Sequence, residues 1–220
     1  MTPDNLNDLK QIQKNYLRDR DPIKTSIHPW RKDWKYIVLH EYRVEKYVET
    51  IINSEKLELS VDDVLLTRSA AIVHDIGKHE NKMNHAEKSA KIILTMFENG
   101  LCSYFTENQM KKLYEMISKH SNKEERDNSN ICLNILKDAD LLDEIGMMSI
   151  FMAGNWINKE DPFYFNEVQK RIEQYEIKFC EKGNDLLYTR SAKEILKEKK
   201  NFIEFVNHQL KNELMGISEL

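Results

Sequence analysis

Two side chains that can bind a metal stand next to each other at His74 and Asp75, two residues before Gly77. An imidazole supplies a nitrogen ligand, and a carboxylate supplies a charged oxygen that can bridge two cations. Adjacent residues of a regular helix point about 100° apart, so both side chains can face one point only where the helix ends. One upstream histidine and one downstream aspartate complete a four-ligand site for a divalent cation, and His40 and Asp140 stand at suitable distances.

Polar residues in apolar stretches give a second reason to expect a metal. His40, His120 and Asp140 each lie on a segment whose other positions predict burial. An unpaired buried charge costs several kcal/mol, and a shared cation satisfies several such groups together. Taken alone, His74-Asp75 is equally a helix-terminal carboxylate bonded to a core histidine. The surrounding pattern favours the metal site.

The elements that must position these residues are predicted to be helices. The 220 residues include only six Gly and four Pro, fewer breakers than a turn-rich β protein needs. Mixed Glu and Lys at helical spacings are typical of solvent-facing helix surfaces. Apolar periodicity and capping signals predict helices over about residues 4–18, 33–54, 60–74, 84–99, 106–119, 129–138 and 161–180, and a terminal helix from about 189. The sequence therefore predicts an all-α protein.

Local signals place the candidate ligands on these helices. His40 falls on the apolar stripe of its helix, so it should face the core. Ser60, followed by Asp63, is an N-cap signal for the helix that runs into His74, and Gly77 is its natural terminator.

The remaining pattern indicates one folding unit. Asn84 and Thr106 are expected to cap the next two helices, and the apolar, Met-rich stretch 145–156 is expected to be buried. No repeat, low-complexity tract or linker interrupts the chain. We therefore expect a single helical domain over residues 1–220.

Composition excludes several classes of protein. The net charge is −4, so no basic field recruits nucleic acid. The N-terminus does not resemble a signal peptide, and no apolar run approaches the roughly 20 residues that cross a bilayer. The three cysteines form no Cys-x-x-Cys pair and fit reduced thiols. We expect a cytoplasmic protein with neither a membrane nor a nucleic-acid partner.

The chemistry-bearing residues, taken in order, resemble those of a known family, the HD superfamily of metal-dependent phosphohydrolases. The likeness covers about residues 36–145 and implies a compact, helical HD-domain-like bundle with helical flanks. It rests on these motifs: His40-x-x-Arg-Val44, His74-Asp-Ile-Gly-Lys78, Asn84-His-Ala-Glu-Lys-Ser-Ala90, Ile117-Ser-Lys-His120 and Asp138-Ala-Asp-Leu-Leu-Asp143.

The resemblance implies a role for each matching residue. The metal ligands would be His40, His74, Asp75 and Asp140. His85 and His120 match positions that hold a second metal in some members and touch substrate phosphate or water in others. Both possibilities stay open at this point. The cation would be Mn, Fe, Ni, Zn or Mg, one or two per chain, since mixed nitrogen and oxygen ligands suit all of these.

The implied reaction is hydrolysis of a phosphoester of a small phosphorylated metabolite, with a nucleotide as the expected substrate. A divalent cation activates water and polarises the phosphoryl oxygens, and nearby cations neutralise their charge. Arg43 lies one turn from His40, and Lys78 lies one turn from Asp75, so we expect both to act with Asp75 in catalysis. Asp143 either orients a ligand or caps the following segment.

Two other function classes remain as alternatives. Some similar proteins are di-iron oxygenases whose six ligands follow the order His, His-Asp, His, His, Asp, and this chain has that order. A non-catalytic metal- or nucleotide-binding module is the other alternative, although no ligand position is lost. No Gly-Tyr-Pro occurs, which argues against a cyclic dinucleotide as substrate. The long terminal helix is a candidate interface for a homo-oligomer.

Overall fold

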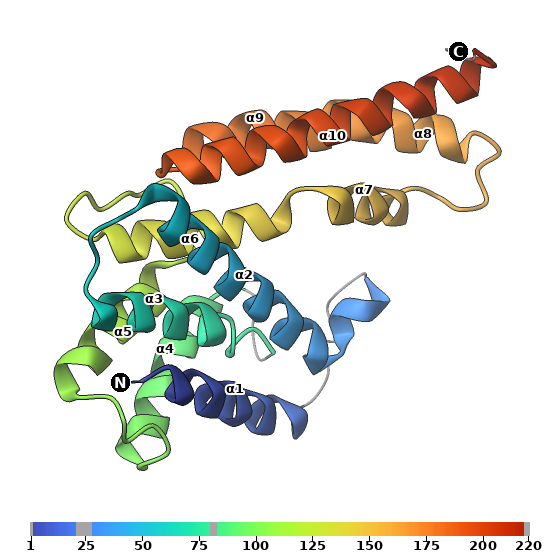
Figure 1. Ribbon diagram of the computed structural model, residues 1–220. Coiled ribbons are helices and arrows are strands. Elements are labelled where there is room, and N and C mark those ends of the chain that lie inside the picture. Colours follow the sequence, from blue (N-terminus) through green and yellow to red (C-terminus); the bar gives the residue numbers. More distant parts are fainter. Residues whose placement is uncertain (1, 21–27, 80–82, 218–220) are drawn as a thin grey trace. The chain divides into compact units, whose positions relative to one another are not determined.

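The computed structural model describes residues 2–20, 28–79 and 83–217, and every regular element within them is a helix (Figure 1). The all-α prediction is confirmed. The chain divides into two compact units, residues 1–140 and 141–220. The expectation of a single helical domain stays a prediction.

The first unit carries all of the predicted metal ligands. Its elements are α1 (Pro3–Arg18), the 3-10 helix η1 (Pro29–Lys32), α2 (Trp34–Glu55), α3 (Val61–Val73), α4 (His85–Glu98), α5 (Glu107–Lys119) and the greater part of α6 (Ile131–Glu144).

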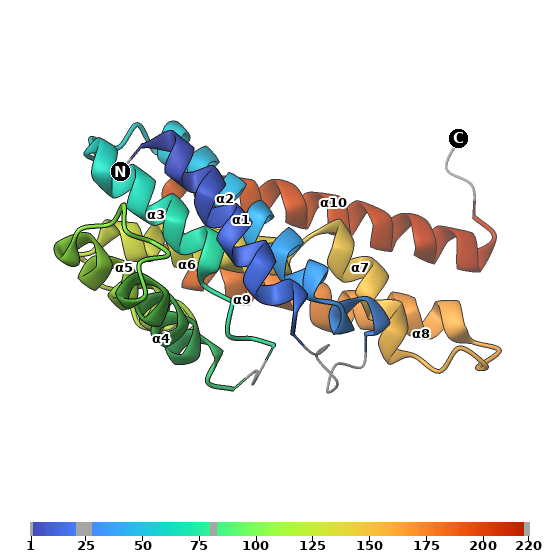
Figure 2. The ribbon, with the colours of Figure 1, turned by 90° about the horizontal axis from the view of Figure 1, so that it is seen from below.

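Helix α3 lies at the centre of this unit. It packs against α1, α2 and α5, and α4 packs against α5 (Figure 2). Residues from Leu65 to Val73 are buried, apart from the partly exposed Arg68. A helix that is apolar all round belongs in a core, so the end of α3 delivers its last residues to the interior of the unit.

In the first unit, two of the three expected caps form. The Ser60 hydroxyl accepts a hydrogen bond from the Asp63 N–H at 3.1 Å, and Thr106 and Gln109 form a reciprocal capping box. Asn84 occupies the N-cap position of α4, but its side chain makes no capping hydrogen bond.

Helix α6 is longer than predicted. The pattern predicted an end near residue 138, whereas the helix continues to Glu144 and includes Asp140 and Asp143. No glycine or proline interrupts it before Gly146, which has a φ of 129° that side chains rarely adopt. The local stop signal, rather than the apolar run, sets the end of this helix.

The second unit is also helical. Its elements are the end of α6, α7 (Met147–Ala153), the 3-10 helix η2 (Gly154–Trp156), α8 (Tyr164–Arg171), the π-helix η3 (Ile172–Glu176), α9 (Ile177–Leu186) and α10 (Arg190–Met215). The predicted helix over 161–180 is therefore three consecutive segments that reach Leu186. Thr189 caps α10 by accepting from the Ala192 N–H, as expected.

The prediction that residues 145–156 are buried holds for Ile145 and is wrong for four other large side chains. Met147, Met148, Phe151 and Trp156 are exposed, Phe151 by 70%. Helix α7 is short and turns Ser149 and Ala153 inward, so its bulky residues face outward. Apolar composition without a clear period does not identify the buried face.

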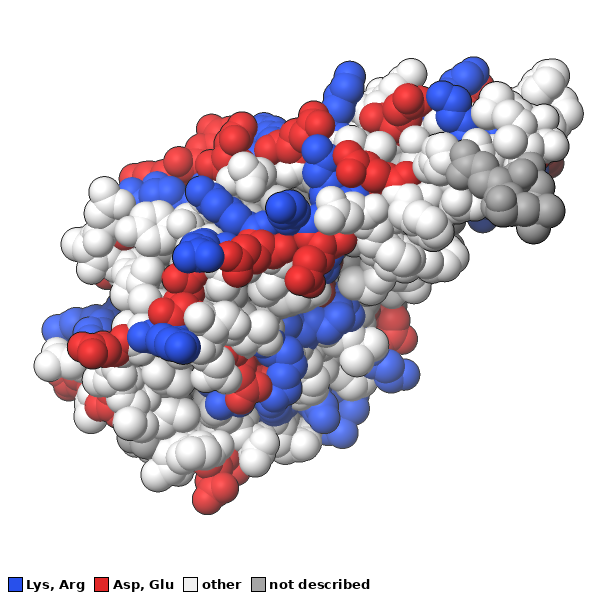
Figure 3. Space-filling view, turned by 45° about the horizontal axis from the view of Figure 1, so that its top comes forward, with Lys and Arg blue, Asp and Glu red and all other residues white. Residues whose placement is uncertain are grey.

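Surface character agrees with the composition. On the face shown in Figure 3, Lys and Arg side chains are interspersed with Asp and Glu side chains. Among the described residues, no helix is long and apolar enough to cross a membrane.

Candidate metal centre

The end of α3 releases the backbone at the predicted metal ligands. In a continued helix the carbonyl oxygen of Ala71 would accept from the N–H of Asp75. Here that oxygen accepts instead from Nδ1–H of His74, at 2.9 Å. The contact holds the ring proton on Nδ1 and leaves Nε2 of His74 able to bind a metal.

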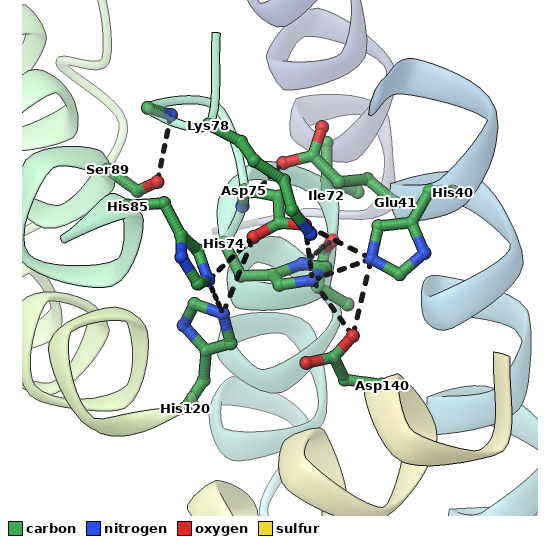
Figure 4. A network of polar contacts seen from close by, with 12 residues as sticks. His40, Glu41, Ile72, His74, Asp75, Lys78, His85, Ser89, His120 and Asp140 are labelled. Atoms are coloured by element: carbon green, nitrogen blue, oxygen red, sulfur yellow. Dashed lines mark hydrogen bonds and ion pairs between the residues drawn. The ribbon is translucent and has the colours of Figure 1, made fainter. Parts of the chain in front are cut away.

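Four side-chain atoms converge there, and we call them the first donor set (Figure 4): His40 Nε2, His74 Nε2, Asp75 Oδ2 and Asp140 Oδ1. His40 Nε2 lies 3.2 Å from His74 Nε2, 3.2 Å from Asp75 Oδ2 and 3.3 Å from Asp140 Oδ1. His74 Nε2 lies 3.8 Å from Asp75 Oδ2 and 3.5 Å from Asp140 Oδ1. Ligands bound at about 2.0–2.2 Å, with angles of about 90–120° between them, stand about 2.8–3.8 Å apart, so these separations fit one cation.

A second donor set uses the other oxygen of Asp75: Asp75 Oδ1, His85 Nε2 and His120 Nε2. His85 Nε2 lies 3.2 Å from both of the other atoms, and His120 Nε2 lies 3.6 Å from Asp75 Oδ1. Nδ1–H of His120 donates to the Ile117 carbonyl oxygen at 2.7 Å, which again leaves Nε2 for a ligand. Asp75 Oδ1 is buried and accepts no hydrogen bond from the part of the chain that the structure describes, as expected of an oxygen that binds a cation.

Burial and charge keep these groups in the protonation states that ligands need. Burial alone raises the pKa of Asp75, but the Lys78 ammonium and the His74 imidazole overcome it and hold that pKa well below the usual range. The pKa of Asp140 is also well below the usual range, because Lys123 and His74 outweigh the effect of burial. Burial lowers the pKa of His120 to about 4. Ionised carboxylates and a neutral imidazole are the metal-binding forms.

Two lysines lie at the edge of the centre. The Lys78 ammonium pairs with Asp75 Oδ2. The Lys123 ammonium pairs with Asp140 Oδ2 and donates to the His120 carbonyl oxygen at 3.0 Å. Both side chains are partly exposed, 23% and 14% respectively, unlike the carboxylates they contact.

Gly77 brings α4 close to the end of α3. Its N–H donates to the Ser89 hydroxyl at 2.9 Å, and a Cβ at position 77 would lie 2.7 Å from the Ser89 backbone nitrogen. The sequence suggested that Gly77 terminates the helix. Since α3 already ends at Val73, the glycine instead allows the close approach of α4. The approach places His85, the first residue of α4, beside Asp75.

The structure thus brings together six residues that the sequence singled out. They are His40, His74, Asp75, His85, His120 and Asp140. Their roles as metal ligands stay predictions.

The site roles predicted for two other residues, Arg43 and Asp143, also stay predictions. Arg43 lies on α2 one turn after His40 and is partly exposed. Asp143 lies on α6 one turn after Asp140 and is buried. The contacts of the two donor sets given above include neither side chain.

Sequence reasoning missed two residues of the centre. Lys123 lies in a polar loop, where a lysine is ordinarily a solvated charge, and only its spacing of three residues after His120 hinted at a contact. Glu41 follows His40 directly and is fully buried, and its Oε1 accepts from the Asp75 N–H at 2.8 Å. Nothing in a single sequence separates it from a surface glutamate.

Comparisons with known proteins agree with this arrangement. The family model for the HD domain matches residues 38–145. No curated protein matches the chain.

Solved structures share the fold at low sequence identity. An HD-superfamily hydrolase from Bacillus thuringiensis has a TM-score of 0.66 at 18% identity, over 96% of this chain and 97% of that one. YpgQ from Bacillus subtilis has a TM-score of 0.62 at 18% identity, over 98% of each chain. A predicted HD-superfamily hydrolase from an uncultured Thermotogales bacterium has a TM-score of 0.60 at 18% identity, over 94% of this chain and 91% of that one.

The match of the HD family model covers both donor sets, from His40 to Asp140. Residues 38–145 therefore form an HD domain, and the chain is an HD-domain protein.

Proposed function

We propose that the protein is a metal-dependent phosphohydrolase that cleaves a phosphoester of a small phosphorylated metabolite, specifically a nucleotide. The observation that carries the proposal is the pair of donor sets that share Asp75. The HD domain and its hydrolase-like structural neighbours support a metal-dependent hydrolase.

The residues present fit two cations. His40, His74, Asp75 and Asp140 would hold one, and Asp75, His85 and His120 would hold the other, through the oxygen that accepts no hydrogen bond. Imidazole nitrogens with carboxylate oxygens suit Mn, Fe, Ni or Zn, and also Mg where carboxylates dominate. Bound cations supply an activated water near neutral pH and polarise the phosphoryl oxygens.

The lysines would contribute the rest of the electrostatic stabilisation. Lys78 and Lys123 sit beside opposite carboxylates of the first donor set and reach solvent, so a phosphoryl group entering from solvent would meet their ammonium groups. Donors placed before the reaction offset the charge that develops on the phosphoryl oxygens. We propose the same kind of contact for Arg43 from α2.

A nucleotide is the proposed substrate on one further ground. A solved structure of Bacillus subtilis YpgQ, which has a TM-score of 0.57 to this chain at 18% identity, is a complex with ADP. That complex supports, for this chain, a substrate that combines a base, a sugar and phosphates.

The six assembled donors also fit the di-iron oxygenase alternative. Lys78 and Lys123 favour phosphate chemistry, because two ammonium groups at the edge of a site attract an anionic substrate. Measuring phosphate release and oxygen consumption on the same sample separates the two classes.

The experiment uses full-length protein purified without chelator. Phosphate release is measured on a panel of nucleotides and simple phosphate esters, with Mn²⁺, Mg²⁺, Ni²⁺ or Fe²⁺ added. We expect release from at least one nucleotide, dependence on the cation, and loss of activity in Asp75→Asn. Asp63→Asn, on the partly exposed first turn of α3, is the matched control. Unchanged phosphate release from metal-free protein would contradict the proposal, and metal binding with no release on any substrate would favour a binding module.

A further inference from the structure

Two buried polar side chains hold the backbone on either side of His74. The Gln13 amide Nε2, from α1, donates to the Ile72 carbonyl oxygen at 2.8 Å and also to Glu41 Oε2. Glu41 Oε1, from α2, accepts from the Asp75 N–H at 2.8 Å. Gln13 and Glu41 are each 0% exposed. We call these two residues the brace.

The brace replaces hydrogen bonds that the end of α3 gives up. The carbonyl oxygen of Ala71 is taken by the His74 ring, so the Asp75 N–H has no acceptor within the helix. A buried N–H without an acceptor is unfavourable, and Glu41 removes that penalty. Gln13 satisfies the Ile72 carbonyl oxygen in the same way. The backbone is thus fixed on both sides of His74.

The carboxyl group at position 41 has partners of a different kind from those of its buried neighbour on the same helix. Burying a polar group is costly unless hydrogen bonds or an opposite charge offset it. Glu45, one turn further along α2 and equally buried, pairs with Lys10 at 3.4 Å and with the Arg68 guanidinium. The hydrogen bonds of Glu41 come instead from an amide and a backbone N–H. An apolar side chain would leave the Asp75 N–H without this acceptor, so the polar group at position 41 is tied to the contact with Asp75.

We propose that Gln13 and Glu41 are positioning residues for the metal centre. By fixing the backbone from Ile72 to Asp75, they keep Oδ2 of Asp75 facing His40 and Oδ1 facing His85. Two consecutive residues of α2 therefore serve the centre: His40 as a ligand, and Glu41 as the support of Asp75. The inference rests on the proposed metal centre, because the alignment of Asp75 matters only if its oxygens bind cations.

The test measures Mn²⁺ affinity by calorimetric titration of chelator-treated, full-length protein, with the melting temperature recorded for every variant. Glu41→Leu removes the acceptor, and we expect Mn²⁺ affinity to fall about 10- to 100-fold, as for other residues that support ligands. Glu41→Gln keeps an acceptor for the Asp75 N–H. Its amide nitrogen then faces Gln13 Nε2, so this variant gives up the contact with Gln13 while it keeps the contact with Asp75. We expect this conservative variant to retain affinity within about threefold.

Glu45→Leu is the matched control. It removes an equally buried carboxylate from the same helix, so we expect a lower melting temperature with Mn²⁺ affinity within about twofold of the wild type. Gln13→Leu provides a second route should Glu41→Leu fail to fold, and we expect it to lower Mn²⁺ affinity in the same direction.

The outcomes separate the inference from the function on which it rests. Wild-type affinity in both Glu41→Leu and Gln13→Leu would overturn the brace, as would an equal loss in Glu45→Leu. A large loss in Glu41→Gln would also overturn it, because the hydrogen-bond acceptor would then not be what matters. A wild-type chain that binds no Mn²⁺ would instead contradict the metal centre itself, before any variant is measured.

Discussion

Two buried aspartates on α6, two residues apart, are held in opposite ways. Asp138 Oδ1 lies 3.1 Å from the Arg126 guanidinium, so its charge is offset by a permanent partner. Asp140 Oδ1 faces the nitrogens of His40 and His74, and its other oxygen meets the partly exposed Lys123. The difference shows that burial of a carboxylate does not identify a site. What identifies it is the convergence of neutral nitrogen donors on a buried carboxylate oxygen.

The largest expected effect comes from exchanging the two aspartates for asparagine one at a time. Asp140→Asn should lower phosphohydrolase activity about 10³-fold or more, because it removes a charged ligand. Asp138→Asn should cost about 1–3 kcal/mol of unfolding free energy by weakening the contact with Arg126, with activity nearly unchanged. Activity assays and denaturant titrations on both variants check this. Equal losses of activity would erase the distinction.

The next effect concerns the lysines that accompany these aspartates. Lys123→Met should lower kcat/KM about 10²-fold, since a preplaced cation is lost from the phosphoryl group. Lys137→Met on α6, whose ammonium donates to the Glu125 carbonyl oxygen at 2.6 Å, should leave kcat/KM within about twofold. Steady-state kinetics on the substrate found in the nucleotide panel gives both values. An equal loss of kcat/KM in Lys137→Met and Lys123→Met would contradict a specific role for the lysine beside Asp140.

A smaller effect is expected on stability when the cation binds. Mn²⁺ at about 30 times the Kd of each donor set should raise the free energy of unfolding by about 2 kcal/mol for each set that it occupies, because only the folded chain assembles the donors. Asp138→Asn should show the same increment as the wild type. Asp140→Asn keeps only the second donor set, so it should show about half of that increment. Urea titrations with and without Mn²⁺ measure all three. An increment in Asp140→Asn as large as in the wild type would place the cation elsewhere.

The smallest effect is a pH dependence at Lys137. Burial lowers the pKa of Lys137 to about 8. The unfolded chain therefore binds more protons than the folded chain between pH 8 and about 10.5, and stability rises with pH in that window. Between pH 8 and pH 9 we expect a gain of about 1 kcal/mol in the wild type relative to Lys137→Met. Parallel pH dependences in the two proteins would show that the Lys137 ammonium is not destabilised by burial.

Local chemistry explains which features the sequence could predict. The caps at Ser60, Thr106 and Thr189 depend on residues three positions apart, so the pattern contains the whole interaction. His40, His120 and Asp140 could be singled out because histidine and aspartate are unusual on apolar helix faces, whereas His85 was singled out by the family resemblance. Their convergence on Asp75 depends on how the helices of the first unit pack together. The sequence pattern does not contain this packing, so the prediction that these residues meet came from the family resemblance.

Features that depend on long-range contacts could not be predicted. Glu41 meets Asp75 across 34 residues, and Lys123 meets Asp140 across 17. Each looks like an ordinary charged residue until the helices are packed. The exposure of Phe151 and the π-helix η3 could not be predicted either, because neither produces a periodic signal in the sequence of its own segment.

The most direct test of the central claim is the metal content of the protein, because the account requires Asp75 to be shared by two donor sets. Elemental analysis of full-length protein loaded with Mn²⁺ and freed of excess cation should find about two ions per chain. His120→Ala should retain about one ion, and Asp75→Asn should retain almost none. A wild-type chain that holds no metal, or an Asp75→Asn variant that holds as much as the wild type, would contradict the account.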